Sequence, residues 1–257
     1  MKENSKVKNQ YKNDNNLQTR ISIHEKYSVN KQGFGNWIIE QYDMREGYSI
    51  LELGCGNGSM WKNHINEIPE RTSLILTDFS NGMLEKAKEN LHNSDKISFE
   101  NVDIQSLPYE DKSFDIIIAN MMLYHVPDLN KALEEVKRVL KDNGTFYCAT
   151  FGENGITNYI KGLINDAKVK EESECIFTLQ NGEGKLRKYF NSVVKRNYED
   201  ALEITNTEDL VDYVISLKGI EDFNKISREE LTTILDRQKV SGKIVVPKEY
   251  GMFISKK

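Results

Sequence analysis

The chain has 257 residues, of which 38% are hydrophobic and 29% charged, so it can bury one sizeable core and leave room for an appendage. A formal net charge of -5 argues against the broad basic face of a nucleic-acid binder, and no apolar run is long enough to span a membrane. Small molecules or proteins are therefore the expected substrates. Three scattered cysteines, with no C-x-x-C pair and no histidine at metal spacing, predict neither a disulfide framework nor a metal site, and favour a cytoplasmic protein with reduced thiols.

The first residues are rich in lysine and asparagine and almost free of apolar side chains. We expect a disordered tail over residues 1–20, without the apolar region of a secretory signal, and a single domain over residues 21–257. Phe34, Trp37, Ile38 and Tyr42 recur near helical spacing. A leading helix within residues 24–43, closed by Gly47, is therefore expected to pack on the core.

Residues 49–58 read Ser-Ile-Leu-Glu-Leu-Gly-Cys-Gly-Asn-Gly, an apolar run that ends in an acid and three alternating glycines. This pattern predicts a strand that feeds a glycine turn. Without a Cβ, Gly54, Gly56 and Gly58 can take positive φ, so a nucleotide-like ligand can lie against bare backbone at the start of the next helix. The G-x-G-x-G spacing differs from the dinucleotide pattern G-x-G-x-x-G, and Glu52 would repel a diphosphate and suit a cation.

From residue 49 to 150, short β-branched runs alternate with amphipathic segments, which is typical of strand-helix-strand units in a parallel sheet. The expected strands are 49–53, 73–77, 97–102, 114–119 and 144–150. Ser80 is expected to cap the helix after the second strand, and Asp128 or Asn130 the helix after the fourth. Asn143 and Gly144 are expected to end that later helix.

Beyond residue 150 the pattern changes. Helical spacing over 158–170 and 182–190 precedes an extended run over 193–198, and capping-box patterns at Thr205 and Ser227 open two further helices. Two last extended runs, 243–246 and 250–255, are joined through Pro247 and Gly251. We expect a helical cap or lid within about 153–242, inserted beside a core of about 47–150 plus the C-terminal strands; a packing extension without ligand contact is the alternative.

Acidic residues follow two of the expected strands, where a doubly wound sheet binds its ligand. Asp78 comes about 20 residues after the glycine turn, where a carboxylate can accept both hydroxyls of a ribose. Asp103 and the amide of Ile104 can read an adenine edge. Phe79 and Met83 are placed either to sandwich the adenine or to pack in the core.

Three motifs occur in order: E-L-G-C-G-N-G from Glu52, L-P-Y with S-F-D after Leu107, and L-Y-H-V-x-D from Leu123. Together they resemble the motifs of class I S-adenosylmethionine-dependent methyltransferases of the small-molecule, ubiquinone-biosynthesis-like kind, well over residues 47–150 and loosely outside them. The resemblance implies a Rossmann-like α/β fold, a seven-stranded mostly parallel sheet with helices on both faces. It also implies S-adenosylmethionine as cofactor, with S-adenosylhomocysteine as product.

The resemblance further implies which residues hold this cofactor. Asn120 and Met121 would flank its methionine part, and Tyr27 would close over it. With the residues already considered, the expected cofactor site comprises Tyr27, Glu52, Gly54, Cys55, Gly56, Asp78, Phe79, Met83, Asp103, Ile104, Asn120 and Met121. Cys55 is expected to serve as a small side chain in the turn, not as a reactive thiol.

Methyl transfer to O, N or C of a small acceptor needs alignment, exclusion of water and, where the nucleophile carries a proton, a base. His125 is the leading candidate base, because an ordinary histidine pKa lies near neutrality; a structural hydrogen-bonding role is the alternative. Tyr124 is a second candidate, and Tyr27, His24 and Glu153 are weaker ones. An acceptor that is already deprotonated needs no base.

Two other functions stay open at this point. One is a non-catalytic protein that binds S-adenosylmethionine, and the other is an NAD-dependent dehydrogenase, which the glycine spacing and Glu52 disfavour. The residues after Asn120 do not read N-P-P-Y, so methylation of adenine or of a glutamine side chain loses support. The acceptor, the methylated atom and the oligomeric state are not predicted.

Overall fold

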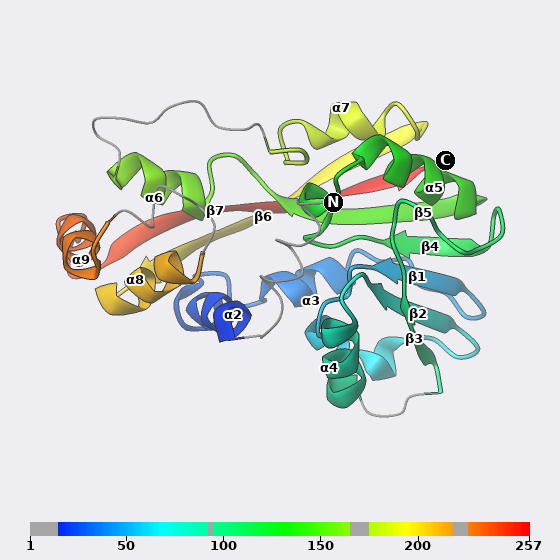
Figure 1. Ribbon diagram of the computed structural model, residues 1–257, viewed down its shortest axis with the longest axis horizontal. Coiled ribbons are helices and arrows are strands. Elements are labelled where there is room, and N and C mark those ends of the chain that lie inside the picture. The colour runs from blue at the N-terminus through cyan, green and yellow to red at the C-terminus, as the bar shows by residue number, and fades with distance from the viewer. Residues whose placement is uncertain (1–14, 92–94, 165–174, 218–225) are drawn as a thin grey trace.

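The computed structural model describes residues 15–91, 95–164, 175–217 and 226–257 (Figure 1). A seven-stranded sheet with the order β3-β2-β1-β4-β5-β7-β6 forms its centre. Neighbours among β1 to β5 run parallel, and β7 lies antiparallel between β5 and β6, which confirms the predicted fold class. The strands are β1 (Ser49–Leu53), β2 (Ser73–Asp78), β3 (Ile97–Asn101), β4 (Phe114–Ile118), β5 (Leu140–Phe151), β6 (Ser192–Ile204) and β7 (Ile244–Lys256).

Helices cover both faces of the sheet, and the apolar runs of the central strands explain why. In β1, Ile50 faces one side of the sheet and Leu51 the other, and both are fully buried. Helices α5 (Leu129–Val139) and α7 (Gly182–Leu186) pack on the Leu51 face. The Ile50 face is covered by α3 (Phe34–Ile39), α4 (Asn81–Leu91) and the 3-10 turn η1 (Ser59–Trp61). Two further 3-10 turns are η2 (Ile65–Glu67) and η3 (Leu123–His125).

Strands β6 and β7 continue beyond the sheet as a two-stranded ribbon (Figure 1, left). Their pairing runs from Ser192 opposite Lys256 to Ile204 opposite Ile244, whereas β5 reaches only as far as Tyr250. Four helices surround the ribbon: α2 (Asn15–Tyr27), α6 (Ile156–Ile164), α8 (Thr207–Ser216) and α9 (Arg228–Asp236). Their apolar side chains form a core separate from that of the sheet.

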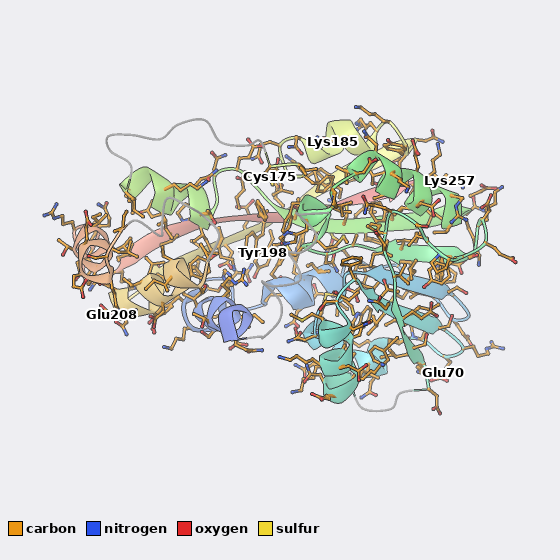
Figure 2. The ribbon with its side chains drawn as sticks, viewed as in Figure 1. Glu70, Cys175, Lys185, Tyr198, Glu208 and Lys257 are labelled. Carbon is orange, nitrogen blue, oxygen red and sulfur yellow. The ribbon has the colours of Figure 1, made fainter. Side chains whose placement is uncertain are left out.

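Tyr198 on β6 lies at the junction of ribbon and sheet (Figure 2). Its ring centroid lies 5.2 Å from that of Phe34 and 5.4 Å from that of Trp37, and both of these residues belong to α3. These aromatic contacts join α3 to the ribbon. Through Tyr198, the ribbon therefore contacts the helix that covers the Ile50 face of the sheet.

The structure corrects several expected boundaries near the N-terminus. The single leading helix is wrong: the chain forms α2 and α3, and the break before α3 is at Gly33, whose φ is 80°. Helix α2 begins at Asn15, so residues 15–20 of the expected tail are helical, and residues 1–14 lie outside the described part. A positive φ is open to glycine at low cost, which explains why the chain changes direction there.

The helix after β4 also ends earlier than expected. Asp128 caps α5 by accepting the Lys131 N–H at 3.0 Å, which settles the two cap candidates, but the helix stops at Val139. Leu140 is already extended and pairs with Phe114, so burial in the sheet replaces the expected glycine cap. Gly144 is needed for packing, because a Cβ there would lie 2.7 Å from the Leu140 side chain.

Caps and strands near the C-terminus differ in part from expectation. Ser80 lies 3.4 Å from the Met83 amide and Ser227 accepts the Glu230 N–H, as predicted, whereas Asn206 and not Thr205 caps α8. The two last extended runs form one strand, β7, through Pro247 and Gly251. Pro247 lies beyond the end of β5, where β7 has an open edge that tolerates a missing N–H.

The expected helices and extended run between residues 153 and 242 are found with different lengths. Helix α6 ends at Ile164, so residues 165–170 of its expected range lie outside the described part, and α7 ends at Leu186. The expected run 193–198 is the first half of the much longer β6. Among the described helices, none is both long enough and apolar enough to cross a membrane.

Candidate functional site

A cavity of about 1960 Å³ opens at the carboxyl ends of β1, β2, β3 and β4 and extends to the ribbon helices α2, α6 and α8. A ligand site at this edge is typical of doubly wound sheets. The cavity gathers nearly all of the predicted site residues from four strand ends. Those that line it are Glu52, Gly54, Cys55, Gly56, Asp78, Phe79, Met83, Asp103, Ile104, Asn120, Met121, Tyr124 and His125, together with the weaker candidates His24 and Glu153.

The glycine turn has the backbone that its sequence predicts. Gly54, Gly56 and Gly58 have φ values of 73°, 58° and 70°. A Cβ on Gly54 would lie 2.9 Å from the Met122 side chain, so a larger residue would both strain the turn and collide with the cavity wall. The Cys55 amide donates to the carbonyl of Thr77 at 2.8 Å, which ties the turn to β2.

Cys55 is half-buried in this turn, and its thiol is expected to be unreactive. Burial raises its pKa well above the ordinary value, and the nearby carboxyls of Glu52 and Asp78 raise it further. The thiol therefore stays protonated at neutral pH, and a protonated thiol is a poor nucleophile. These contacts fit the expected role of a small side chain in the turn.

Asp78 connects the glycine turn to the start of α4. Its Oδ2 accepts the Gly56 N–H at 2.9 Å and its Oδ1 accepts the Ser80 N–H at 2.7 Å. Burial raises the pKa of this carboxyl, and the two N–H donors oppose that effect. Each oxygen keeps further acceptor capacity on the cavity side, so the carboxylate can accept hydroxyls while it holds the turn.

Asp103 lies at the end of β3 and forms the turn that follows. Its Oδ1 accepts from both the backbone and the side-chain amide of Gln105, at 2.9 and 3.0 Å. The ordinary turn-forming role of an aspartate is therefore present in addition to its place in the cavity lining. Phe79 is 37% exposed and Met83 is buried in α4, so the two expected neighbours of the adenine differ in accessibility.

Glu52 is buried beneath the glycine turn and accepts the indole N–H of Trp61 at 2.5 Å. Burial raises its pKa to about 7, although the Trp61 hydrogen bond lowers it. The carboxyl is thus harder to ionise than an ordinary glutamate. A cation bound beside it would favour the ionised form.

Asn120 and Met121 follow β4 and line the cavity. The Asn120 side-chain N–H donates to the Tyr42 hydroxyl at 2.6 Å, while its Oδ1 is buried and has no hydrogen-bond partner within the described residues. Met121 has a φ of 54°, which is unusual for a residue with a side chain and occurs preferentially at functional sites. The lone Asn120 oxygen is a place for a ligand N–H donor.

His125 and Tyr124 lie on η3 at the mouth of the cavity. Burial lowers the pKa of His125 to about 4, and the positive charge of Arg20 lowers it further. The expectation of a near-neutral pKa is therefore wrong, because the sequence could not show how far the ring is buried. The Tyr124 ring lies 4.4 Å from that of His125 and 4.7 Å from that of Phe151, so it acts as part of an aromatic wall.

His24, Glu153 and Tyr27 are placed differently from one another. Burial lowers the pKa of His24 to about 3, and its ring lies in the cavity wall. Glu153 accepts the Thr178 hydroxyl at 2.8 Å. Tyr27 is not in the cavity lining: its hydroxyl donates to Asp209 on α8 at 2.5 Å, so the structure does not bring it to the site.

Among the lining residues that were not singled out from the sequence are Arg20, Tyr213 and Tyr250. They come from α2, α8 and β7, and no short motif links positions so far apart. The sequence offered one signal for this part of the lining, which was the spacing of Arg20 and His24 by one helical turn. Arg20 was the last residue of the expected tail, so this spacing was not interpreted.

Because the pKa values of His24 and His125 are lowered by burial, the stability of the fold should depend on pH. Their ordinary pKa is about 6.5, so between about pH 4 and 6.5 the unfolded chain binds more protons at these positions than the folded chain. Stability is therefore lost as pH falls through this window, by up to about 1.4 kcal/mol per pH unit for each histidine. The variant His24→Gln/His125→Gln should lose this part of the slope when urea unfolding is compared at pH 7.5, 6.5 and 5.5; equal slopes in both proteins would contradict the assignment.

The lining fits the cofactor that the sequence motifs imply. Asp78 offers a carboxylate for hydroxyls, and the Asn120 oxygen needs a donor such as an ammonium group. The carboxyls of Glu52 and Asp78 beside the glycine amides suit a cation and oppose a diphosphate. The Gly54 position leaves no room for a Cβ.

Comparisons with known proteins agree with this reading of the fold. The chain is 33% identical over 112 residues to a demethylmenaquinone methyltransferase of Staphylococcus aureus, an alignment that covers 43% of this chain and 46% of that protein. The chain thus spans about half the length of the curated relatives it matches.

Solved structures share the fold at low sequence identity. The YcgJ protein of Bacillus subtilis aligns with a TM-score of 0.58 at 17% identity, over 87% of this chain and 98% of that one. A phosphoethanolamine N-methyltransferase of Haemonchus contortus, determined with S-adenosylhomocysteine, aligns with a TM-score of 0.55 at 16% identity, over 95% of this chain and 57% of that one. The profile of the methyltransferase domain family matches residues 44–193. The chain therefore belongs to the methyltransferase domain family, in the class I group that uses S-adenosylmethionine.

Proposed function

We propose that this protein transfers a methyl group from S-adenosylmethionine to O, N or C of a small-molecule acceptor. The observation that carries the proposal is one continuous cavity that begins at the glycine turn and Asp78 and ends among the ribbon helices. Its volume of about 1960 Å³ exceeds the roughly 300–1,000 Å³ of an ordinary ligand pocket, so it offers room for a cofactor and an acceptor together. The demethylmenaquinone methyltransferases among its relatives, by their name, also act on a small molecule.

The residues of the sheet edge would hold the cofactor. Asp78 would accept ribose hydroxyls, Asp103 with the Ile104 amide would read the adenine, and the Asn120 oxygen would accept from the ammonium group. When bound, the cofactor supplies a methyl group on a positively charged sulfur that is already activated for displacement. The protein then has to align the acceptor with that methyl group and exclude water.

The ribbon helices would supply the acceptor side of the site. Helices α2, α6 and α8 lie over the cavity, which supports a lid that shields the acceptor from water. His125 and Tyr124 lie where the acceptor would approach. Because the pKa of His125 is about 4, we propose that the neutral ring accepts a hydrogen bond and positions the acceptor, since it is too weak a base to take a proton from a poor acid.

Glu52 gives the proposal a pH signature. A bound cation favours ionised Glu52, whose pKa is about 7 in the free protein, so binding should release a proton below that pH. As the pH increases toward 7, the affinity for S-adenosylmethionine should therefore increase by up to about 10-fold per pH unit. Above pH 7 the affinity should become independent of pH. Calorimetric titration from pH 6 to 8 measures this. Glu52→Gln should be insensitive to pH over the same range, and an unchanged pH dependence in that variant would rule the carboxyl out.

Turnover is tested with methyl-labelled S-adenosylmethionine and a panel of small O-, N- and C-nucleophiles. The expected result is label in a small-molecule product and formation of S-adenosylhomocysteine, both abolished by Asp78→Ala. Tight cofactor binding without label transfer to any acceptor would instead favour a non-catalytic binding protein. Hydride transfer with added nicotinamide cofactor would contradict the proposal outright.

A further inference from the structure

The far end of the cavity carries a positive charge beside an unsatisfied imidazole. Arg20 and His24 lie one turn apart on α2, and both line the cavity. The Nδ1 atom of His24 is buried and has no hydrogen-bond partner among the residues that the structure describes. A buried ring nitrogen of this kind requires a partner, and the cavity is where a ligand can provide it.

Aromatic rings form the walls around this pair. The His24 ring lies 6.2 Å from the Tyr213 ring and 5.8 Å from the Tyr250 ring, and both tyrosines line the cavity. The Tyr250 hydroxyl lies 3.4 Å from His24 Nε2. Burial raises the pKa of this phenol well above its ordinary value, so it remains protonated and can donate to Nε2. The neutral imidazole then carries its proton on Nδ1 and presents an N–H to the cavity.

The Arg20 charge acts on the same rings. Burial has the largest effect on the pKa values of His125 and Tyr213, and the positive charge of Arg20, which lowers both, has the second largest. The guanidinium is therefore close enough to both side chains to act on them electrostatically. A guanidinium has five N–H donors, so a contact within the protein is compatible with binding a ligand oxygen as well. Glu25, the residue after His24 on α2, is exposed, and Glu153 accepts from the Thr178 hydroxyl.

We propose that the acceptor is a carboxylic acid with a planar apolar body, and that its carboxylate is held by the Arg20 guanidinium and the His24 Nδ1–H between Tyr213 and Tyr250. This inference rests on the proposed function, because it names the substrate class for the same cavity. A carboxylate arrives ionised at neutral pH and matches a guanidinium with two parallel hydrogen bonds. The aromatic walls suit a planar body stacked against them.

The test uses three acids, benzoate, phenylacetate and cinnamate, each paired with its neutral amide. Binding of each probe to the wild-type protein saturated with S-adenosylhomocysteine is measured by calorimetry, so no turnover is needed. Each acid is expected to bind at least about 10-fold more tightly than its amide. Arg20→Gln should remove this preference and Arg20→Lys should keep part of it. Lys26→Gln, a lysine of the same helix that pairs with Asp209, is the matched control and should keep all of it.

The affinity for S-adenosylhomocysteine is measured first for every variant, and its retention shows that the variant is folded. If the wild-type protein fails to bind S-adenosylhomocysteine, the proposed function falls and this inference falls with it. If S-adenosylhomocysteine binds but acids and amides bind equally, or no acid binds, the carboxylate site alone is overturned. A preference that survives in Arg20→Gln also overturns it.

Discussion

Asp78→Ala should weaken S-adenosylhomocysteine binding about 100-fold, which corresponds to about 2.7 kcal/mol at 25 °C. Two losses combine in this variant. The ribose loses a charge-assisted acceptor, worth about 1.5–3 kcal/mol, and the amides of Gly56 and Ser80 lose the carboxylate that holds the glycine turn in place. Calorimetric titration of the purified variant gives the affinity directly.

Two further variants separate these losses. Asp78→Asn keeps one oxygen for an amide N–H, so it should preserve more of the turn and lose less affinity than the alanine. Asp142→Ala removes an exposed carboxylate that pairs with Lys112 away from the cavity, and should bind like the wild type. Wild-type affinity in Asp78→Ala would remove this residue from the site.

Lys248→Met should lower the free energy of unfolding by about 3–5 kcal/mol, the largest effect on stability that we expect from one substitution. The side chains of Lys248 and Asp200 are 2% and 0% exposed where they form an ion pair in the ribbon. Lys248 also donates to the Ser28 hydroxyl at 2.9 Å, and Asp200 accepts from the Asn30 amide. Methionine keeps the bulk of the side chain but leaves a buried carboxylate without its cation. Urea unfolding at pH 7.5 measures the loss.

The ribbon offers a matched control for burial. Lys243, the residue directly before β7, pairs with Glu203 on β6 at 2.5 Å, but these side chains are 48% and 40% exposed. Lys243→Met should therefore cost less than about 1 kcal/mol. Lys248→Met/Asp200→Asn should recover part of the loss, because the double variant buries no unpaired charge. If Lys248→Met and Lys243→Met lower the free energy of unfolding by the same amount, the buried ion pair contributes no more to stability than the exposed one.

The part of the molecule from Ser49 to Phe151 could be predicted in detail because its information is local. Each strand there is a short apolar run, and the glycine turn, Asp78 and Asp103 follow strand ends at readable spacing. Their meeting in one cavity follows from the parallel order of the strands. The assignment of individual roles to these residues stays a prediction.

The strand pairing of the ribbon and the ribbon end of the cavity could not be predicted, for physical reasons. The pairing of β6 with β7 depends on strands about fifty residues apart, and Pro247 read locally as a strand end. Arg20, Tyr213 and Tyr250 meet only after the ribbon helices have packed. The pKa of His125 depends on burial by residues far from it in sequence, so an ordinary value was the wrong starting point.

We propose that the cavity beside the glycine turn binds the adenosyl cofactor of methyl transfer. A crystal structure of the protein with S-adenosylhomocysteine tests it most directly. We expect the ribose at the Asp78 carboxylate, the adenine beside Asp103 and Ile104, and the ammonium group at the Asn120 oxygen. A ligand bound elsewhere, or a cavity that stays empty at saturating ligand while a dinucleotide binds in its place, would contradict it.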